Sequence, residues 1–195
     1  MTQAEALRIF QDTGALQKGH FKLSSGLHSG QYMQCALALQ HPEHAERLSR
    51  ELASKFKNDG VSVVIGPALG GVIVSYEIAR ALGVRSIFAE REDGKMTLRR
   101  GFAIDKKDKV LVVEDVVTTG ASTKEVLDIV KKSGASIVGV GALVDRSRDV
   151  NFEERFISLL NIDISTFKPE DCPLCKEKMP LVKPGSRDLR LKTQG

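Results

Sequence analysis

Two adjacent acids, Glu114 and Asp115, follow the apolar run Val110–Val113, which is typical of a buried β-strand. Two carboxylates at the end of such a strand are too costly to bury without partners. We therefore expect them to face solvent, a cation or the hydroxyl groups of a ligand. This part of the chain is the first candidate for chemistry.

A row of hydroxyl side chains around a glycine comes directly after the acids. The segment consists of Val116, Val117, Thr118, Thr119, Gly120, Ala121 and Ser122. A helix is expected to begin here, and its first N–H groups and partial positive charge would favour a phosphate. Taken alone, Ser122 or Thr123 could equally be a helix cap. The whole string, with two acids before it, favours a site for a phosphorylated sugar.

Three more segments carry glycines or charges after predicted strands. The sequence "GPALGG" at 66–71 would let the backbone approach phosphate groups closely. The run "EREDGKMTLRRGF" at 90–102 is dense in charge and, by itself, typical of a solvated hairpin. Arg146 follows a predicted strand at 136–145, and an arginine in that place often forms a surface ion pair, here with Asp145 or Asp149.

Strands and helices alternate along the chain and must position these residues. Helices are expected at 1–16, 42–56, 72–82 and 121–133, and strands at 61–66, 84–89, 109–114 and 136–145. This alternation predicts an α/β fold with a doubly wound, mostly parallel sheet flanked by helices. Such sheets bind ligands beyond the carboxyl ends of their strands, where the candidate residues fall.

The composition suits a small polyanionic ligand. The chain has 195 residues, a formal net charge of +4 and a pI of about 9.0, with 5% aromatic residues and no Trp. Stacking platforms for single-stranded nucleic acid are therefore scarce, and we expect no nucleic-acid partner. No apolar run is long enough for a membrane span and no signal peptide is recognisable, so we expect no membrane partner and a cytoplasmic location.

The cysteines and histidines are harder to place. Cys35 lies in an apolar stretch and is expected in the core. Cys172 and Cys175 form a C-x-x-C, which is half of a zinc site, but no second pair follows it nearby. We favour a surface loop with two free thiols, with a metal site shared between subunits as the alternative. The four histidines have no spaced partner in the sequence, so no protein metal ligand is predicted.

The string from Val110 to Ser122 resembles the ribose-phosphate motif of the type I phosphoribosyltransferases. Further stretches, "GHFKLSSGLHSGQY", "GPALGG", "EREDGKMTLRRGF", "GALVDRS" and "CPLCKEKMPLVKPGSR", are similar to bacterial orotate phosphoribosyltransferases. The resemblance covers nearly the whole chain. It implies a single type I phosphoribosyltransferase domain over 1–195, with a small hood formed by about 1–40 and 165–195 and a mobile lid at about 90–102.

The resemblance also implies a reaction and its residues. Orotate and phosphoribosyl diphosphate would give orotidine 5-monophosphate and diphosphate in pyrimidine (UMP) biosynthesis. Glu114 and Asp115 match the acids that hold the ribose hydroxyls, and Val116 to Ser122 match the loop that holds the 5-phosphate. Arg91 and Lys95 match lid residues that bind the diphosphate, Lys95 being catalytic together with the two acids. Arg146 and Thr118 match residues that contact orotate.

The family pattern further implies Mg²⁺ as cofactor, bound mainly by substrate oxygens, and a homodimer whose lid residues reach the neighbouring site. The sequence departs from that pattern at two lysine positions, and its lid lacks the histidine that some members carry. Many family members have a lysine where Ser24 stands and another where Gly70 stands. Lys22 could share the face of Ser24 on a strand. These departures concern the diphosphate contacts more than the reaction.

Two alternatives stay open. One is a phosphoribosyltransferase for another base, against which the segments around "KLSSG", "GALVD" and "KPGSR" argue. The other is a regulator that senses phosphoribosyl diphosphate and binds nucleic acid. The basic pI favours the regulator, but the chain offers no added winged helix or basic helical stripe.

Overall fold

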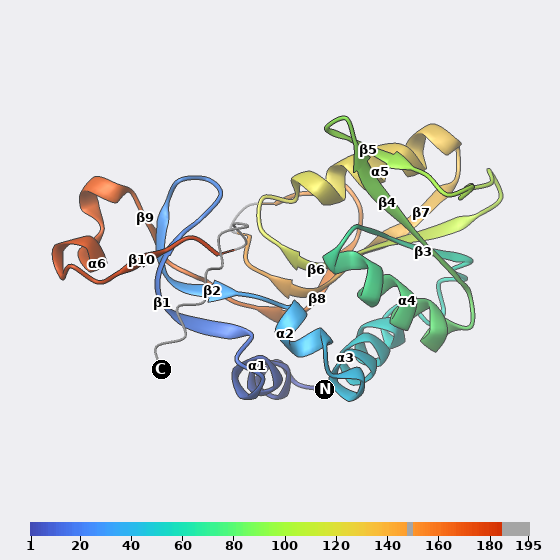
Figure 1. Cartoon of the computed structure of the whole chain (residues 1–195). Helices are drawn as coiled ribbons and strands as arrows, with labels where there is room; N and C mark the ends of the chain where they lie inside the picture. Colours follow the sequence, from blue (N-terminus) through green and yellow to red (C-terminus); the bar gives the residue numbers. More distant parts are fainter. Residues whose placement is uncertain (148–149, 185–195) are drawn as a thin grey trace. The chain divides into compact units, whose positions relative to one another are not determined.

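The structure is a computed structural model that describes residues 1–147 and 150–184 (Figure 1). The chain forms two compact units. The larger unit comprises Met1–Ala15 and Gln34–Asp163, and the smaller comprises Leu16–Met33 and the chain from Ile164 onward.

A six-stranded sheet forms the middle of the larger unit. Its order is β5-β4-β3-β6-β7-β8, and neighbouring strands are parallel except for the antiparallel pair β4 and β5. The strands are β3 (Val63–Pro67), β4 (Arg85–Glu92), β5 (Lys95–Leu98), β6 (Lys109–Val117), β7 (Ser136–Asp145) and β8 (Phe156–Asn161). The predicted α/β fold with a mostly parallel sheet is confirmed.

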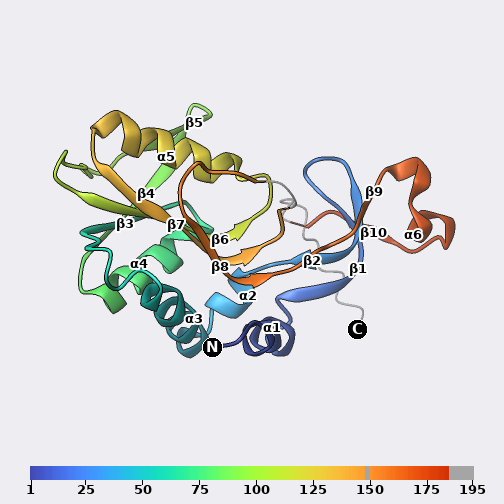
Figure 2. The same ribbon diagram turned by 180° about the vertical axis from the view of Figure 1, so that it is seen from behind.

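Helices cover both faces of this sheet (Figures 1 and 2). On one face lies α5 (Ala121–Ser133), whose Val126, Leu127 and Val130 join the strands in a fully apolar core. On the other face α3 (Pro42–Ser54) and α4 (Gly70–Leu82) pack against each other, preceded by the short α2 (Ala36–Leu39). Both faces of the central strands are thus covered, which explains their continuous valine and isoleucine runs.

The N-terminal helix α1 (Gln3–Asp12) is amphipathic as predicted, with Ala6, Ile9 and Phe10 buried. It contacts β8 within the larger unit. Its start is fixed by a capping box, in which Thr2 Oγ1 accepts from Glu5 N at 3.2 Å and Glu5 Oε2 accepts from Thr2 N at 2.7 Å. Among the described helices, none has the length and apolar character needed to cross a membrane.

The smaller unit is a four-stranded sheet of order β10-β1-β2-β9. Its elements are β1 (Leu16–Lys22), β2 (His28–Met33), β9 (Thr166–Phe167), the 3-10 helix η1 (Pro169–Asp171), α6 (Pro173–Lys176) and β10 (Leu181–Val182). The hood expected from about 1–40 and 165–195 stays a prediction; of its N-terminal part, the smaller unit contains Leu16–Met33. Residues 1–15 belong to the larger unit because the apolar face of α1 is buried there. Residues 185–195, including part of "KPGSR", lie outside the described residues.

Candidate functional site

The sheet of the larger unit changes its winding direction at β3 and β6. Strand β3 pairs with β4 on one side and with β6 on the other. In doubly wound sheets the ligand crevice lies beyond the carboxyl ends of the strands at such a switch point. Here β3 ends at Pro67 and β6 ends at Val117. The segments that follow them are the ones in which the sequence predicted phosphate-binding backbone.

The two acids lie within β6, not after it. We expected a strand at 109–114, but the pairing of Val116 with Val144 and of Val117 with Asp145 extends it to Val117. The long neighbour β7 supplies the hydrogen-bonding partners that make this extension possible. Glu114 is consequently buried, with 8% of its surface exposed, while Asp115 is half-buried.

Burial changes the protonation of this pair in the unliganded protein. The pKa of Glu114 rises to about 9, first because burial disfavours the charged form and second because Asp115 is negatively charged. Burial also raises the pKa of Asp115. The Asp115 carboxylate also accepts a backbone hydrogen bond, because Val116 N donates to Asp115 Oδ1 at 2.9 Å. The pair therefore holds a proton near neutral pH until a ligand supplies positive charge or hydroxyl donors.

A small cavity of about 50 Å³ lies against Glu114. Its lining is a continuous stretch of chain, namely Glu114, Val116, Val117, Thr118, Thr119, Gly120, Ala121, Ser122 and Thr123. Helix α5 begins at Ala121, and its N-cap residue Gly120 has no side chain to cap it. Ala121 N donates to Thr119 Oγ1 over a long 3.4 Å, a weak bond that a ligand could replace. The structure thus brings together one of the two predicted acids and the whole predicted phosphate loop.

Gly120 is required in this loop for two reasons. Its φ is +71°, in the left-handed region that favours glycine. In addition, a Cβ atom at this position would lie 2.9 Å from both Phe152 Cε1 and Val150 Cγ1. The backbone is therefore packed directly onto the side chains beneath it, which fixes the direction in which the first N–H groups of α5 point.

The glycines of "GPALGG" are packed as closely. A Cβ at Gly66 would overlap the carbonyl of Gly71, and a Cβ at Gly71 would lie 2.9 Å from Pro67 Cδ. A Cβ at Gly70 would collide with the carboxylate of Asp115. Asp115 therefore lies against the start of α4, so the turn after β3 and the acids of β6 meet at the switch point. This contact also occupies the space in which the lysine of many family members would have to begin.

Arg146 stands at the end of β7, next to the end of β6. Its backbone N–H donates to Val117 O at 2.9 Å, and its side chain is half-buried. The neighbouring Asp145 carboxylate accepts from Ser147 N at 2.8 Å, Ser147 Oγ at 2.6 Å and Asn161 Nδ2 at 3.0 Å. Asp149, the other candidate ion-pair partner, lies outside the described residues.

The charged run 90–102 forms the hairpin of β4 and β5 at the edge of the sheet. Arg91 makes a two-pronged ion pair with Glu125 of α5, at 2.7 and 3.0 Å, and donates to Gly94 O at 2.8 Å. Lys95 opens β5 with an exposed side chain. Neither residue lines the small cavity, so the structure does not bring these two predicted site residues to the acids.

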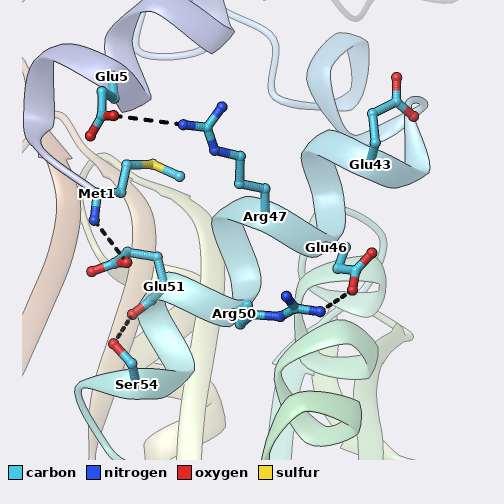
Figure 3. A pocket seen from close by; sticks show the side chains of 8 residues that line it. All are labelled: Met1, Glu5, Glu43, Glu46, Arg47, Arg50, Glu51 and Ser54. Atoms are coloured by element: carbon cyan, nitrogen blue, oxygen red, sulfur yellow. Dashed lines mark hydrogen bonds and ion pairs between the residues drawn. The ribbon is translucent and has the colours of Figure 1, made fainter.

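A further cavity lies elsewhere, between α1 and α3, with a volume of about 540 Å³ (Figure 3). Most of its charged groups form ion pairs with one another. The amino group of Met1 lies 2.8 Å from Glu51 Oε2, Arg47 lies 3.7 Å from Glu5 Oε1, and Arg50 pairs with Glu46. Ion pairs within and between α1 and α3 thus line this cavity. Its described residues do not offer the few converging polar groups that are typical of a ligand site.

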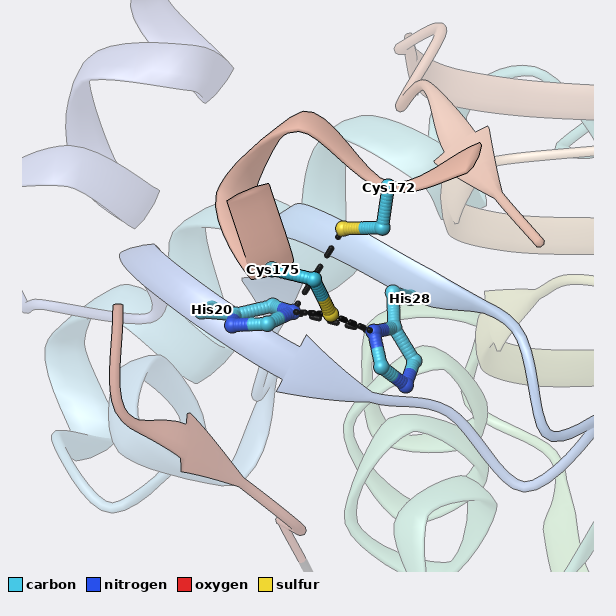
Figure 4. A group of neighbouring side chains, drawn as sticks. All are labelled: His20, His28, Cys172 and Cys175. Atoms are coloured by element: carbon cyan, nitrogen blue, oxygen red, sulfur yellow. Dashed lines mark hydrogen bonds between the residues drawn. The ribbon is translucent and has the colours of Figure 1, made fainter. Parts of the chain in front are cut away.

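One group of residues escaped the sequence analysis. His20 and His28, expected to lack partners, face each other and both cysteines of the C-x-x-C (Figure 4). The thiol of Cys172 is buried, so the surface-loop prediction is wrong for this residue. No local spacing could have shown the cluster, because the histidines and cysteines are separated by well over a hundred residues. Cys35 is in the core, as predicted.

Comparison with known proteins places this fold and site in a class. The family model of the phosphoribosyl transferase domain matches residues 38–173, more than half of the chain. The match contains the turns after β3 and β6 and the acids of β6. The chain has the fold of the phosphoribosyltransferases and belongs to this class.

Individual relatives narrow the class. An orotate phosphoribosyltransferase of Pelotomaculum thermopropionicum is 59% identical over 97% of this chain and 100% of its own length. One of Desulforamulus reducens is 54% identical over the same shares. The crystal structure of the Aeropyrum pernix orotate phosphoribosyltransferase matches with a TM-score of 0.68 and 25% identity over 80% of this chain and 92% of that chain. This chain belongs to the orotate phosphoribosyltransferase family.

Proposed function

We propose that this protein transfers ribose 5-phosphate from phosphoribosyl diphosphate to orotate. In this reaction the bond between the anomeric carbon and the diphosphate oxygen breaks, and diphosphate leaves with the electron pair. A bond forms between that carbon and the ring nitrogen of orotate, which loses its proton. One observation carries the proposal: an acid pair and a phosphate cradle on one short segment meet at the switch point of the sheet.

The loop after β6 would hold the 5-phosphate. The hydroxyls of Thr118, Thr119 and Ser122 and the first N–H groups of α5 surround the small cavity. A phosphate there would gain several hydrogen bonds and the favourable end of the helix dipole. The sugar would then lie over the end of β6, with its hydroxyls next to Glu114 and Asp115.

The acids would serve binding and catalysis at once. Their oxygens accept hydrogen bonds from the ribose hydroxyls, and their negative charge favours the positively charged, oxocarbenium-like sugar that forms as diphosphate leaves. Because the free protein holds a proton on this pair, binding of the donor should release it. The negative charge would then develop where the transition state needs it.

Arg146 would recognise orotate. A guanidinium group can form two parallel hydrogen bonds to a carboxylate or to a ring edge, and orotate offers both. The hydrogen bond from Arg146 N to Val117 O holds the backbone of Arg146 beside the proposed phosphate loop. Thr118, in the same loop, would contact the base as well.

The hairpin of β4 and β5 would act as the lid over the diphosphate. For Arg91 to reach that group it must leave Glu125, an exposed and therefore weak partner. Lys95 is already exposed to solvent. We further propose that the protein works in the cytoplasm as a homodimer in which each lid reaches the neighbouring site. The support for this part of the proposal is the family resemblance and the exposure of the hairpin.

Magnesium fits this site as a cation carried by the substrate. The described residues at the switch point offer two adjacent carboxylates, whose oxygens do not complete the octahedral shell that this ion prefers. When bound, the cation would neutralise the diphosphate and so make it a better leaving group. Asp115, half-buried against the turn after β3, would be the protein group that contacts its water shell.

The direct test follows the ultraviolet absorbance of orotate in a mixture with protein, Mg²⁺ and phosphoribosyl diphosphate. We expect a loss of absorbance that requires all four components. Tight donor binding without any loss of orotate would contradict the proposed acceptor. Uptake of another base in the same assay would then identify the acceptor, and activity with none would favour the sensing regulator.

A further inference from the structure

The smaller unit contains a cluster of four metal-ligating side chains. His20 from β1, His28 from β2 and the pair Cys172 and Cys175 from the start of α6 point toward one another (Figure 4). One ligand atom from each lies within 4.8 Å of the others. His20, His28 and Cys172 are buried, with exposed fractions of 2%, 4% and 0%. Such convergence of four soft or borderline ligands is what a tetrahedral metal site requires.

The distances agree with a tetrahedral N₂S₂ shell. Usual zinc bond lengths give separations of about 3.4 Å between two nitrogens, and of about 3.6 Å between nitrogen and sulfur. Here His20 Nε2 lies 3.0 Å from His28 Nδ1. Cys172 Sγ and Cys175 Sγ lie 3.5 and 3.7 Å from His20 Nε2, and Cys175 Sγ lies 3.3 Å from His28 Nδ1.

A second contact fixes the correct nitrogen of His20. Its other ring nitrogen, Nδ1, lies 2.9 Å from the backbone carbonyl oxygen of Met179 and can donate to it. Metal-binding histidines usually donate their second N–H to a carbonyl in this way, which leaves the ligating nitrogen deprotonated and oriented. With Nδ1 as the donor, Nε2 presents its single lone pair to the centre of the cluster.

Hydrogen bonds alone cannot account for the close approach of these four ligand atoms. The lone pair of His20 Nε2 can accept one hydrogen, yet His28 Nδ1 and both thiols approach it. The two thiols are at best weak donors and weak acceptors. A cation at the centre would serve all four atoms at once, and two thiolates would balance the charge of a divalent ion.

The smaller unit also needs a cross-link. Its described apolar residues that are buried are few, namely Phe21, Met33, Ile164 and Cys172. The C-terminal segment is attached to the β1–β2 hairpin through β9 and β10, which are two residues long each. Units of this size are commonly stabilised by a metal or by disulfides. The cluster joins the hairpin to the segment between β9 and β10.

We propose that His20, His28, Cys172 and Cys175 bind one structural Zn²⁺. Four protein ligands leave no open position for a reacting molecule, so the ion stabilises the smaller unit and takes no part in the transfer. Mixed nitrogen and sulfur ligands in tetrahedral geometry favour zinc over magnesium or calcium. This structural Zn²⁺ differs from the Mg²⁺ that we propose to enter with the diphosphate.

The test measures zinc in the purified full-length chain, prepared without chelators or a metal-affinity step. We expect about one zinc per chain in the parent, and a loss of most of it in Cys175→Ser and in His28→Gln. Matched controls are Cys35→Ser, outside the cluster, and His41→Gln, on the surface; both should keep the parent zinc content. Equal zinc in all five proteins would overturn the assignment.

A second measurement needs no variant to fold. Parent protein stripped of metal and loaded with Co²⁺ should show the intense visible absorption of tetrahedral cobalt and a thiolate charge-transfer band. The stripped parent should also melt about 5 °C or more below the zinc form, and Zn²⁺ should restore it. Failure to take up either ion, or a Cys172–Cys175 disulfide in freshly prepared protein, would overturn the proposal.

Discussion

At the scale of single residues, burial decides how the acid pair behaves. The sequence indicated the acids and the loop after them, because two carboxylates beside hydroxyls and a glycine are informative wherever they occur. It could not indicate that Asp115 lies against Gly70, since that contact joins residues of two separate strand–helix turns. The Asp115 carboxylate fills the space that a side chain at position 70 would need, so its position is consistent with glycine at that position.

Replacement of Glu114 by Gln should change how stability depends on pH. The pKa of Glu114 is raised in the folded chain to about 9, above the ordinary value of 4.5. Between these values the folded chain keeps a proton that the unfolded chain has released, so rising pH favours unfolding. Glutamine has no such proton. The stability of the variant relative to the parent should therefore rise from about pH 5 to pH 9, by at most about 1.4 kcal/mol per pH unit.

Urea unfolding at several pH values measures this difference. Glu43→Gln, at an exposed position of α3, makes the same change at the surface and should give no such slope. A pH-independent difference between Glu114→Gln and the parent would show that Glu114 is ionised in the free protein.

Arg146→Ala should separate the two substrates. Loss of a two-pronged contact to orotate is expected to raise the KM for orotate by about tenfold or more, and the KM for the donor much less. Steady-state kinetics with each substrate varied in turn gives both constants. Arg8→Ala, on the exposed side of α1, is the control. Equal increases for both substrates would mean that the base binds elsewhere.

At the scale of elements, the alternation of strands and helices was readable because each helix has one apolar face and each central strand is apolar throughout. Helix ends were readable as well, since Gly83 and Gly134 close α4 and α5 in the left-handed conformation. The end of β6 was not, because its length depends on pairing with β7. The short strands β9 and β10 carry too few residues to show a pattern.

Gly120→Ala should damage the loop more than a glycine change at an ordinary helix end. Gly120 and Gly83 have the same φ of +71°, but a Cβ meets Phe152 and Val150 at Gly120 and open space at Gly83. We expect Gly83→Ala to cost about 1 kcal/mol, and Gly120→Ala to cost about 1–3 kcal/mol more because of overpacking. Thermal unfolding compares the two.

The same pair of variants separates stability from function. Gly120→Ala should also raise the KM for phosphoribosyl diphosphate, because the N–H groups of α5 would be displaced. Gly83→Ala should leave this constant unchanged. Equal costs in stability with unchanged kinetics would show that the loop adapts to the extra methyl group.

At the scale of the whole molecule, the two units differ in what holds them together. The larger unit has an extensive apolar core. The regular spacing of apolar residues along its helices and strands predicts such a core. The smaller one has a few apolar residues and the His20–His28–Cys172–Cys175 cluster, which depends on residues from both ends of the chain. The sequence offered half of that cluster as a C-x-x-C and gave no means of finding the other half.

The acids of β6 are central to the proposed transfer. The most direct measurement is the turnover of the double variant Glu114→Gln, Asp115→Asn with Mg²⁺, phosphoribosyl diphosphate and orotate. We predict a loss of about a hundredfold or more in a protein that remains folded, and parent-like turnover in a control that carries Glu43→Gln and Asp128→Asn at exposed positions. Near-parent turnover of the folded double variant would contradict the central claim that these carboxylates hold the sugar and stabilise its transition state.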